Sequence, residues 1–261
     1  TLCPTRGSHN AIRHACYGGS RTSSIPLAVA TRRGAHKRVV SEIDAAVFLS
    51  DTSKRTHELH TTLPANAEVI PNFVNPGPRG EIKKELSKRT HWVYVGRLTA
   101  EKGLLELVRQ WPSGEKLVVV GSGPLMEAAQ SLADLSEISF VGNLQADEVL
   151  RILARSRGLV FPSRAPEPAP SLAYLEALSV GLPTLALKGS GTSEDVEAHQ
   201  TGIAFGKFDS LPPVMSRLQQ NWQQLSANAT SRFEAAFTEG VWVSAIEALY
   251  AIVVVDTSSE Q

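Results

Sequence analysis

The stretch HWVYVGRLTAEKGLLELVRQW, residues 91–111, contains the strand–helix unit that decides the fold. Its first part, residues 91–96, is a nearly continuous apolar run, as expected of a strand buried on both faces of a sheet. In residues 103–111 the apolar positions 104, 107, 108 and 111 recur at helical spacing, which predicts an amphipathic helix. A buried strand followed at once by a helix is the building block of parallel α/β proteins.

The same alternation continues on the C-terminal side of this stretch. The pattern predicts strands at 116–121, 138–143, 158–163, 182–189 and 201–206, separated by helices at 123–135, 145–157, 171–181 and 193–198. Repeated strand–helix units with apolar strands predict an α/β fold, a Rossmann-like doubly wound parallel sheet with helices on both faces. Three further helical patterns follow, LPPVMSRLQQNW, SANATSRFEAAF and GVWVSAIEALYAIVV.

Fewer elements precede the stretch. A basic helical segment is predicted at 24–40, and strands at 45–50 and 67–72 lie on either side of a helix with Asp51 as its N-cap. These are too few elements for an independent α/β domain. The chain also begins with Thr1 rather than methionine, so we expect this region to be the latter part of a domain whose first half the sequence does not include.

The composition excludes several classes of protein. Lys+Arg and Asp+Glu number 26 each, so the net charge is zero and a generic nucleic-acid-binding protein is not expected. The only cysteines, Cys3 and Cys16, are too few for a disulfide framework, and a cytoplasmic setting is the default. No Cys/His spacing indicates a metal site. The longest apolar run near the C-terminus, residues 248–255, is too short to cross a bilayer.

Polar residues that follow the strands are the candidates for ligand binding, because ligands bind parallel sheets at the carboxyl ends of the strands. Gly96, Arg97 and Lys102 lie in the turn after the first strand. Two cations beside a helix N-terminus suit a diphosphate, although such a pair alone is more typical of a solvated basic loop.

The turn after the second strand, GSGP, contains Gly121 and Gly123. A dinucleotide fingerprint needs a third glycine where Met126 stands, so this turn does not indicate a dehydrogenase. The two glycines are instead expected where a ligand or another backbone segment approaches closely.

The segment after the fourth strand, which ends at Ser163, carries two carboxylates, Glu167 in a proline-rich loop and Glu176 inside the next helix. Carboxylates accept hydrogen bonds from vicinal sugar hydroxyls, while the free N–H groups near Ser171 and Leu172 suit phosphate oxygens. Together with the two cations, these groups predict a nucleotide-sugar site.

After the fifth strand, Glu194 follows KGSGTS. It either faces the ligand end of the sheet or stabilises the start of a helix through the helix dipole.

At this point a family resemblance is evident. The segments VIPNFVNP, VGRLTAEKGLLELV, LVVVGSGPL, ISFVGN, VFPSRAPEPAPSLAYLEALSVGLPTLAL and GTSEDV occur in this order. In that order they resemble the group 1, or family 4, glycosyltransferases of the GT-B fold, and most closely members that build bacterial surface polysaccharides. The resemblance implies three parts: a partial acceptor-side domain at 1–76, a nucleotide-sugar-binding domain at 77–238, and a crossover helix and tail at 239–261.

The resemblance also implies a reaction, the retaining, metal-independent transfer of a sugar from a nucleotide diphosphate to a glycan or lipid-linked acceptor, with no cofactor. It implies that Arg97 and Lys102 bind the diphosphate and stabilise its developing charge. It further implies that Glu167 contacts the donor sugar and that Glu176 binds the ribose hydroxyls. The remaining donor-binding positions are Gly96, Gly121, Gly123, Ser163, Ser171, Leu172 and Glu194. It implies a cytoplasmic enzyme with peripheral contact at the inner membrane face. The basic segment 31–38 suits anionic lipid headgroups, although such a run is more often a solvated helix face.

Two departures from the family pattern leave alternatives open. The two glutamates stand nine positions apart, at 167 and 176, where the family usually has eight, and Pro168, Ala169 and Pro170 replace the usual glycine and aromatic residue. The first half of the N-terminal domain is not in the sequence, which predicts a donor-binding half with little transferase activity. The alternatives are a non-catalytic nucleotide-sugar-binding module and a GT-B sugar-nucleotide epimerase.

Overall fold

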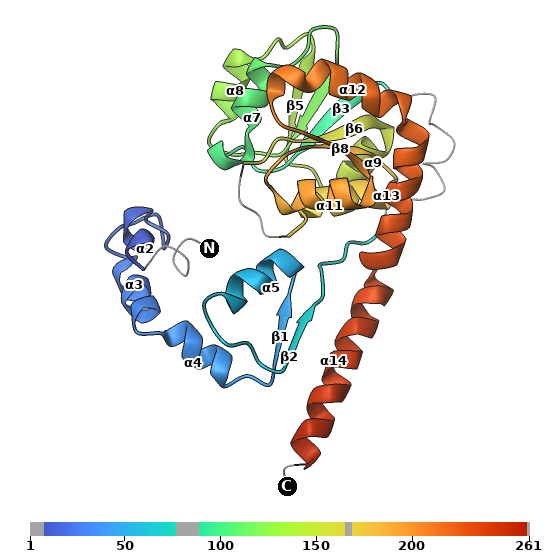
Figure 1. Cartoon of the computed structure of the whole chain (residues 1–261). Coiled ribbons are helices and arrows are strands. Elements are labelled where there is room, and N and C mark those ends of the chain that lie inside the picture. The colour runs from blue at the N-terminus through green and yellow to red at the C-terminus, as the bar shows by residue number, and fades with distance from the viewer. Residues whose placement is uncertain (1–7, 77–88, 165–168, 260–261) are drawn as a thin grey trace. The chain divides into compact units, whose positions relative to one another are not determined.

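The computed structural model describes residues 8–76, 89–164 and 169–259, and the chain divides into two units (Figure 1). One unit is Pro71–Val243, which contains the predicted sheet. The other combines Thr1–Ile70 with Ser244–Gln261.

In the described part of the unit Pro71–Val243, six strands form a parallel sheet in the order β5-β4-β3-β6-β7-β8. Numbered from β3 as the first strand, this is the 3-2-1-4-5-6 order of the doubly wound Rossmann fold. The predicted fold class is therefore confirmed. The strands are β3 (His91–Val95), β4 (Leu117–Val120), β5 (Ile138–Gly142), β6 (Ser156–Phe161), β7 (Thr184–Leu187) and β8 (Gly202–Phe205).

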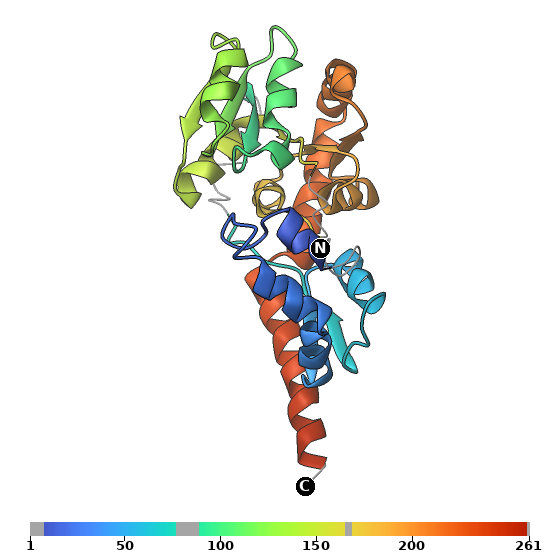
Figure 2. The same cartoon turned by 90° about the vertical axis from the view of Figure 1, so that its left-hand side faces the viewer.

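Helices cover both faces of this sheet (Figures 1 and 2). Side chains alternate along β3: Trp92 and Tyr94 belong to one hydrophobic cluster and Val93 to another. The first cluster includes buried residues of α7, α8 and α12, and the second those of α9, α10, α11 and much of α13. The helices are α7 (Leu104–Arg109), α8 (Met126–Leu132), α9 (Ala146–Arg155), α10 (Leu172–Ser179), α11 (Gly191–His199), α12 (Leu211–Gln220) and α13 (Trp222–Ala236).

Each face of the sheet thus buries an apolar layer of its own, which is why the strands are apolar at successive positions. Short 3₁₀ segments, η2 (Ala100–Lys102) and η3 (Phe208–Ser210), join β3 to α7 and β8 to α12.

The unit formed by Thr1–Ile70 and Ser244–Gln261 contains a parallel pair of strands, β1 and β2, as predicted at 45–50 and 67–72. Phe48 at the end of β1 packs on His57, with ring centroids 5.2 Å apart. The elements before β3 are α2 (His9–Arg13), α3 (Ile25–Arg32), α4 (Ala35–Ser41), β1 (Ala45–Phe48), α5 (Asp51–Glu58) and β2 (Asn66–Val69).

Some boundaries differ from the prediction for local reasons. The helix expected at 123–135 begins at Met126, so Pro124 precedes it. The segment 24–40 forms two helices, because Gly34 between them adopts a left-handed φ of 74°. Ser50, not Asp51, is the N-cap of α5, since its hydroxyl accepts a hydrogen bond from the Ser53 N–H at 3.0 Å.

The last helix, α14 (Glu239–Ser259), begins in the unit Pro71–Val243 and continues through the residues from Ser244 onward. Within the described residues, one helical stretch, Trp222–Val254, has the length and apolar composition needed to cross a membrane. This stretch differs from the prediction because its apolar residues are interrupted by polar ones, and the uninterrupted apolar run covers only residues 248–255.

Candidate functional site

A cavity of about 470 Å³ lies at the carboxyl ends of β3 and β6. These neighbouring strands are where the doubly wound sheet changes direction, the position at which such folds bind ligands. The cavity is lined by the end of β3 and its loop, the segment after β6, and the start of α10. The lining residues are Tyr94, Val95, Gly96, Arg97, Lys102, Phe161, Pro162, Ser163, Ser171, Leu172, Ala173 and Glu176.

The loop after β3 forms the cationic wall of the cavity. Buried Leu98 anchors it, and the Tyr94 hydroxyl donates a hydrogen bond to the Arg97 carbonyl at 2.9 Å. The Arg97 side chain is 77% exposed, and its Nη2 lies 4.0 Å from Glu101 Oε1. Arg97 is therefore loosely held and free to turn toward an anion, and Lys102 lines the same cavity.

Gly121 and Gly123 do not line the cavity but lie behind its cationic wall. A Cβ at Gly121 would stand 2.0 Å from the Gly96 carbonyl oxygen, and one at Gly123 would stand 2.6 Å from that of Leu98. The two loops also exchange backbone hydrogen bonds, among them Leu98 N–H to Ser122 O at 2.9 Å. The glycines allow this close approach of two backbones, which is one of the two roles that the sequence left open.

Gly103, for which the sequence alone indicates no role, lies where the loops after β3 and β6 meet. Its φ is 71°, and a Cβ there would stand 2.2 Å from the Pro162 carbonyl oxygen. Arg164 strengthens this junction, because its N–H donates to the Glu101 carbonyl at 2.8 Å and its side chain pairs with Glu106 at 3.1 Å. The glycine at the end of GRLTAEKG is the sequence feature that could have predicted this close approach.

The start of α10 forms the opposite wall. The hydroxyl of Ser171, its N-cap, accepts a hydrogen bond from the Tyr174 N–H, and the Ser171 N–H donates to the Thr192 hydroxyl at 3.1 Å. Leu172 is exposed, and Ala173 follows it along the cavity wall. The first N–H groups of a helix have no partner within the helix, so this end of α10 presents donors to the cavity.

Glu176 lies one turn farther along the same side of α10. Its side chain is half-buried, and burial raises the pKa of its carboxyl group above the ordinary value. Within the part of the chain that the structure describes, no side chain or backbone group donates a hydrogen bond to this carboxylate. An acceptor that is partly withdrawn from water in this way favours a ligand with hydroxyl or N–H donors.

The other predicted residues divide into three cases. Ser163 is buried at the cavity wall. Glu167 lies outside the described residues. Glu194 is exposed in the first turn of α11 and is not among the lining residues, a position that suits the helix-dipole role. Among the described residues, no group of three or more His, Cys, Asp and Glu side chains could hold a metal ion.

A buried polar network that was not predicted supports α10 from behind. The Tyr174 hydroxyl donates to Asp195 Oδ2 at 2.8 Å and lies 2.7 Å from the Thr201 hydroxyl. Arg232 of α13 closes the network with a 2.6 Å hydrogen bond from Nη2 to Asp195 Oδ1. Burial and then the Asp195 charge raise the pKa of Tyr174 well above its ordinary value, so this hydroxyl keeps its proton.

Comparison with known proteins gives this geometry a family context. A family model described as "Glycosyl transferases group 1" matches residues 89–221, about half of the chain. A GDP-mannose-dependent alpha-(1-6)-phosphatidylinositol monomannoside mannosyltransferase of Mycobacterium tuberculosis is 27% identical over 205 residues, covering 69% of this chain and 52% of the relative. The O-antigen chain mannosyltransferase C of Escherichia coli is 27% identical over 189 residues, covering 65% of this chain and 51% of the relative. The chain thus spans about half the length of these curated relatives.

Solved structures agree in fold at lower identity. A sucrose-phosphate synthase from Thermosynechococcus elongatus superposes with a TM-score of 0.73 at 19% identity, covering 95% of this chain and 66% of the other. Anabaena HepE in complex with UDP and glucose has a TM-score of 0.67 at 19% identity, covering 84% of this chain and 66% of HepE. These similarities concern the fold.

Proposed function

The chain belongs to the group 1 glycosyl transferases, and we propose that its unit Pro71–Val243 binds the nucleotide diphosphate sugar that serves as the donor. The observation that carries this proposal is the half-buried carboxylate of Glu176, to which no described residue donates a hydrogen bond and which lines the same cavity as Arg97 and Lys102. Few ligands need both an anion-binding wall and a hydroxyl-binding carboxylate. A nucleoside diphosphate has a charged diphosphate beside a ribose with two vicinal hydroxyls.

Each wall of the cavity suits one part of the donor. The diphosphate oxygens accept from Arg97, Lys102 and the N–H groups of Leu172 and Ala173. The ribose hydroxyls donate to Glu176. The donor sugar is assigned to Glu167, which is outside the described residues. A nucleotide sugar as the ligand is supported by two similar proteins, since the mycobacterial relative is GDP-mannose-dependent and the Anabaena structure is a complex with UDP and glucose.

The same groups would serve the transfer step. The bond between the anomeric carbon and the donor phosphate oxygen breaks, and negative charge grows on the departing nucleoside diphosphate. Arg97 and Lys102 stabilise this charge electrostatically without a metal ion. In the retaining course that we propose, the acceptor hydroxyl attacks the anomeric carbon on the face of the leaving group and passes its proton to the departing phosphate oxygen. No protein nucleophile or cofactor is required.

The acceptor is assigned to the complete protein rather than to this chain alone. We propose a glycan or lipid-linked acceptor, as in the curated mannosyltransferases, and a peripheral position at the inner membrane face. The chain spans about half of those relatives, so the donor half is expected to bind nucleotide with little turnover.

A calorimetric titration of the chain with GDP, UDP and their sugars tests donor binding. Wild-type protein is expected to bind at least one of them, and Arg97→Ala to weaken binding about tenfold or more through loss of a charged contact. Arg151→Ala is the matched control, since Arg151 is an exposed arginine of α9 outside the cavity lining. Absence of binding by every nucleotide at millimolar concentration would contradict the proposal.

A second candidate, a non-catalytic nucleotide-sugar-binding module, is favoured by one observation, the nine-residue spacing between Glu167 and Glu176. The two candidates predict the same binding and differ in turnover. A longer form of the protein with a complete N-terminal domain should transfer sugar to an acceptor if the chain is part of an enzyme. Donor binding without transfer or donor hydrolysis in that form would favour the binding module.

A further inference from the structure

A second and larger cavity, of about 810 Å³, lies at the opposite end of the sheet. Its lining includes Arg89, two residues before β3, and Arg157, the second residue of β6, so it lies where these parallel strands begin. The donor cavity lies where the same strands end. The remaining lining residues are Gln219, Gln220, Asn221, Trp222, Gln223 and Gln224. The proposed function uses none of these residues.

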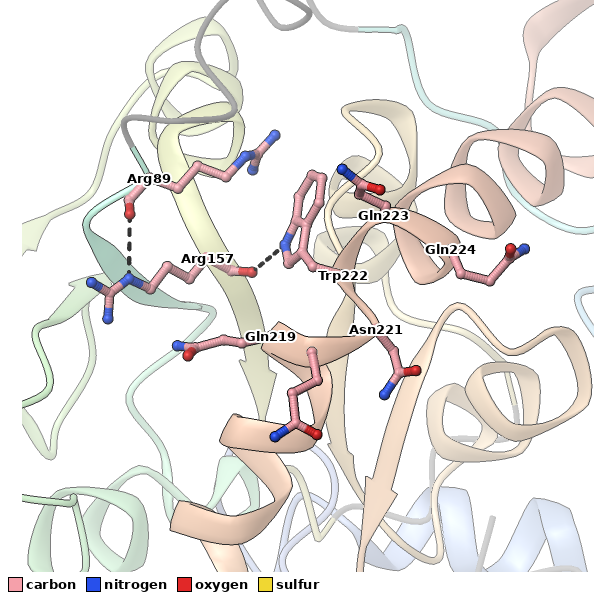
Figure 3. Close-up of a pocket in the computed structure, with 8 residues that line it drawn as sticks. Arg89, Arg157, Gln219, Asn221, Trp222, Gln223 and Gln224 are labelled. Carbon is pink, nitrogen blue, oxygen red and sulfur yellow. Dashed lines mark hydrogen bonds between the residues drawn. The ribbon is translucent and has the colours of Figure 1, made fainter.

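Two arginines form one wall of this cavity (Figure 3), and for one of them the described residues provide no counter-charge. Arg157 is neutralised by Glu115, with 2.8 Å between Nη1 and Oε2. Arg89 donates from Nη1 to the Ser156 carbonyl at 2.6 Å, but no carboxylate among the described residues pairs with it. Its Nε is buried and has no hydrogen-bond partner in the described part of the chain, and burial lowers the pKa of Arg89 to about 10. A desolvated guanidinium of this kind favours an anionic ligand.

The position of Arg89 is fixed by its neighbours. The guanidinium carbon lies 4.5 Å from the centroid of the Trp222 ring, a cation–π contact. The Trp222 indole N–H donates to the Arg157 carbonyl at 2.7 Å, and Arg157 Nε donates to the Arg89 carbonyl at 3.3 Å. Figure 3 shows these two hydrogen bonds linking the arginines and the tryptophan into one connected set. The fold therefore fixes the position of Arg89 in the second cavity, and Arg89 is not simply a solvated surface residue.

The other wall is rich in amides. The sequence QQNWQQ, residues 219–224, joins the end of α12 to the start of α13. Gln224 and Asn221 have protein partners, namely Asn228 Oδ1 at 2.9 Å and the Arg217 carbonyl at 2.8 Å. Among the described residues, no partner engages the side chains of Gln219, Gln220 and Gln223. A primary amide both donates and accepts, which matches the dual character of sugar hydroxyls.

We propose that this second cavity binds a phosphorylated monosaccharide, with the phosphate at Arg89 and the hydroxyls at the free glutamine amides. A guanidinium binds phosphate oxygens through paired N–H donors, and three free amides provide complementary contacts to several hydroxyls. The volume lies in the range of small-molecule pockets. The site is independent of the donor cavity, and β3 and β6 lead from one to the other.

Calorimetric titration with glucose 6-phosphate tests this site, with inorganic phosphate, glucose and glucuronate as comparison probes. Glucose 6-phosphate is expected to bind about tenfold or more tightly than either inorganic phosphate or glucose, because each lacks one half of the contacts. Equal binding of inorganic phosphate would overturn the saccharide part of the proposal. Tighter binding of glucuronate would overturn the phosphate part.

Variants of each wall locate the binding. Arg89→Gln and the double variant Gln219→Ala/Gln223→Ala are each expected to weaken glucose 6-phosphate binding about tenfold. Arg151→Gln and Gln130→Ala are matched controls, because both residues are exposed on helices outside the cavity lining. The exposed glutamines are not part of the core, so the double variant keeps the test valid even if Arg89→Gln fails to fold. Unchanged affinity in the double variant would overturn the site.

Competition separates this site from the donor cavity. Binding of glucose 6-phosphate should persist in Arg97→Ala and in the presence of saturating nucleotide diphosphate. If nucleotide displaces it, the sugar phosphate occupies the donor cavity and the second site is refuted, while donor binding stands. If no nucleotide binds but Arg89-dependent sugar phosphate binding is found, the donor proposal fails and the second site stands.

Discussion

Replacing Glu176 with glutamine should weaken nucleotide binding while leaving the fold as stable as before or more stable. The carboxylate is half-buried and has no donor among the described residues. Burying an unsatisfied charged group destabilises the folded state, and a neutral amide of the same shape reduces this penalty. Without ligand, the free energy of unfolding at pH 7 is therefore expected to rise, by an amount on the order of 1 kcal/mol.

The pH dependence of this difference follows from the raised pKa. Between the ordinary glutamate pKa and the raised value, the folded state holds a proton that the unfolded state has lost. Wild-type stability therefore falls as pH rises through this window, since the slope follows the protons bound in the unfolded minus the folded state. The advantage of Glu176→Gln should be absent below the window and fully present above it.

Nucleotide binding should change in the opposite direction. A hydrogen bond to a charged group contributes about 1.5–3 kcal/mol, and the amide of glutamine retains only a neutral acceptor. Loss of this contribution corresponds to roughly 10- to 150-fold weaker binding of a ribose-containing diphosphate. Inorganic diphosphate has no ribose, so its affinity should not fall.

Denaturant unfolding at several pH values and calorimetric titration provide the two measurements. Glu127→Gln is the matched control, since Glu127 is an exposed glutamate in the first turn of α8, and neither quantity should change. The reasoning is refuted if Glu176→Gln binds the nucleotide as tightly as the wild type. A marked loss of stability in this variant would equally refute it, because it would reveal a stabilising partner for the carboxylate.

Three further substitutions test individual contacts of the fold, each by denaturant unfolding. Gly121→Ala should cost at least about 1–3 kcal/mol, because the new Cβ meets the neighbouring backbone oxygen, whereas Gly240→Ala in open space should not destabilise. Tyr174→Phe should cost about 1–3 kcal/mol by leaving buried partners unpaired, whereas exposed Tyr250→Phe should change stability by less than about 0.5 kcal/mol. Ser50→Ala should cost about 1 kcal/mol through loss of the helix cap. Neutral results at Gly121, Tyr174 or Ser50 would contradict the corresponding contact.

The sheet was predictable because apolar strands and amphipathic helices alternate with clear periodicity from His91 onward. The site was predictable in outline, because parallel strands place their following loops at one edge. Gly96, Arg97, Lys102, Ser163, Ser171, Leu172 and Glu176, which are far apart in sequence, line one cavity. Their chemical roles remain predictions.

Other features depend on three-dimensional approach and leave no periodic signal. The reason for glycine at 121 and 123 is clear only from the structure, where a Cβ at either position would clash with the backbone of the loop after β3. The Tyr174–Asp195–Arg232 network joins three helices, and no local spacing links these residues. The amide-rich segment 219–224 resembled an ordinary helix end, and only the fold brings it beside Arg89.

The most direct test of the central claim is an NMR titration of the isotopically labelled chain with the nucleoside diphosphate that binds best. The claim is that the diphosphate lies at the carboxyl ends of β3 and β6. The backbone amide signals of Gly96, Arg97, Leu172 and Ala173 should shift together and saturably, with one dissociation constant. Saturable shifts confined to other parts of the chain, or no shift at millimolar nucleotide, would contradict the account.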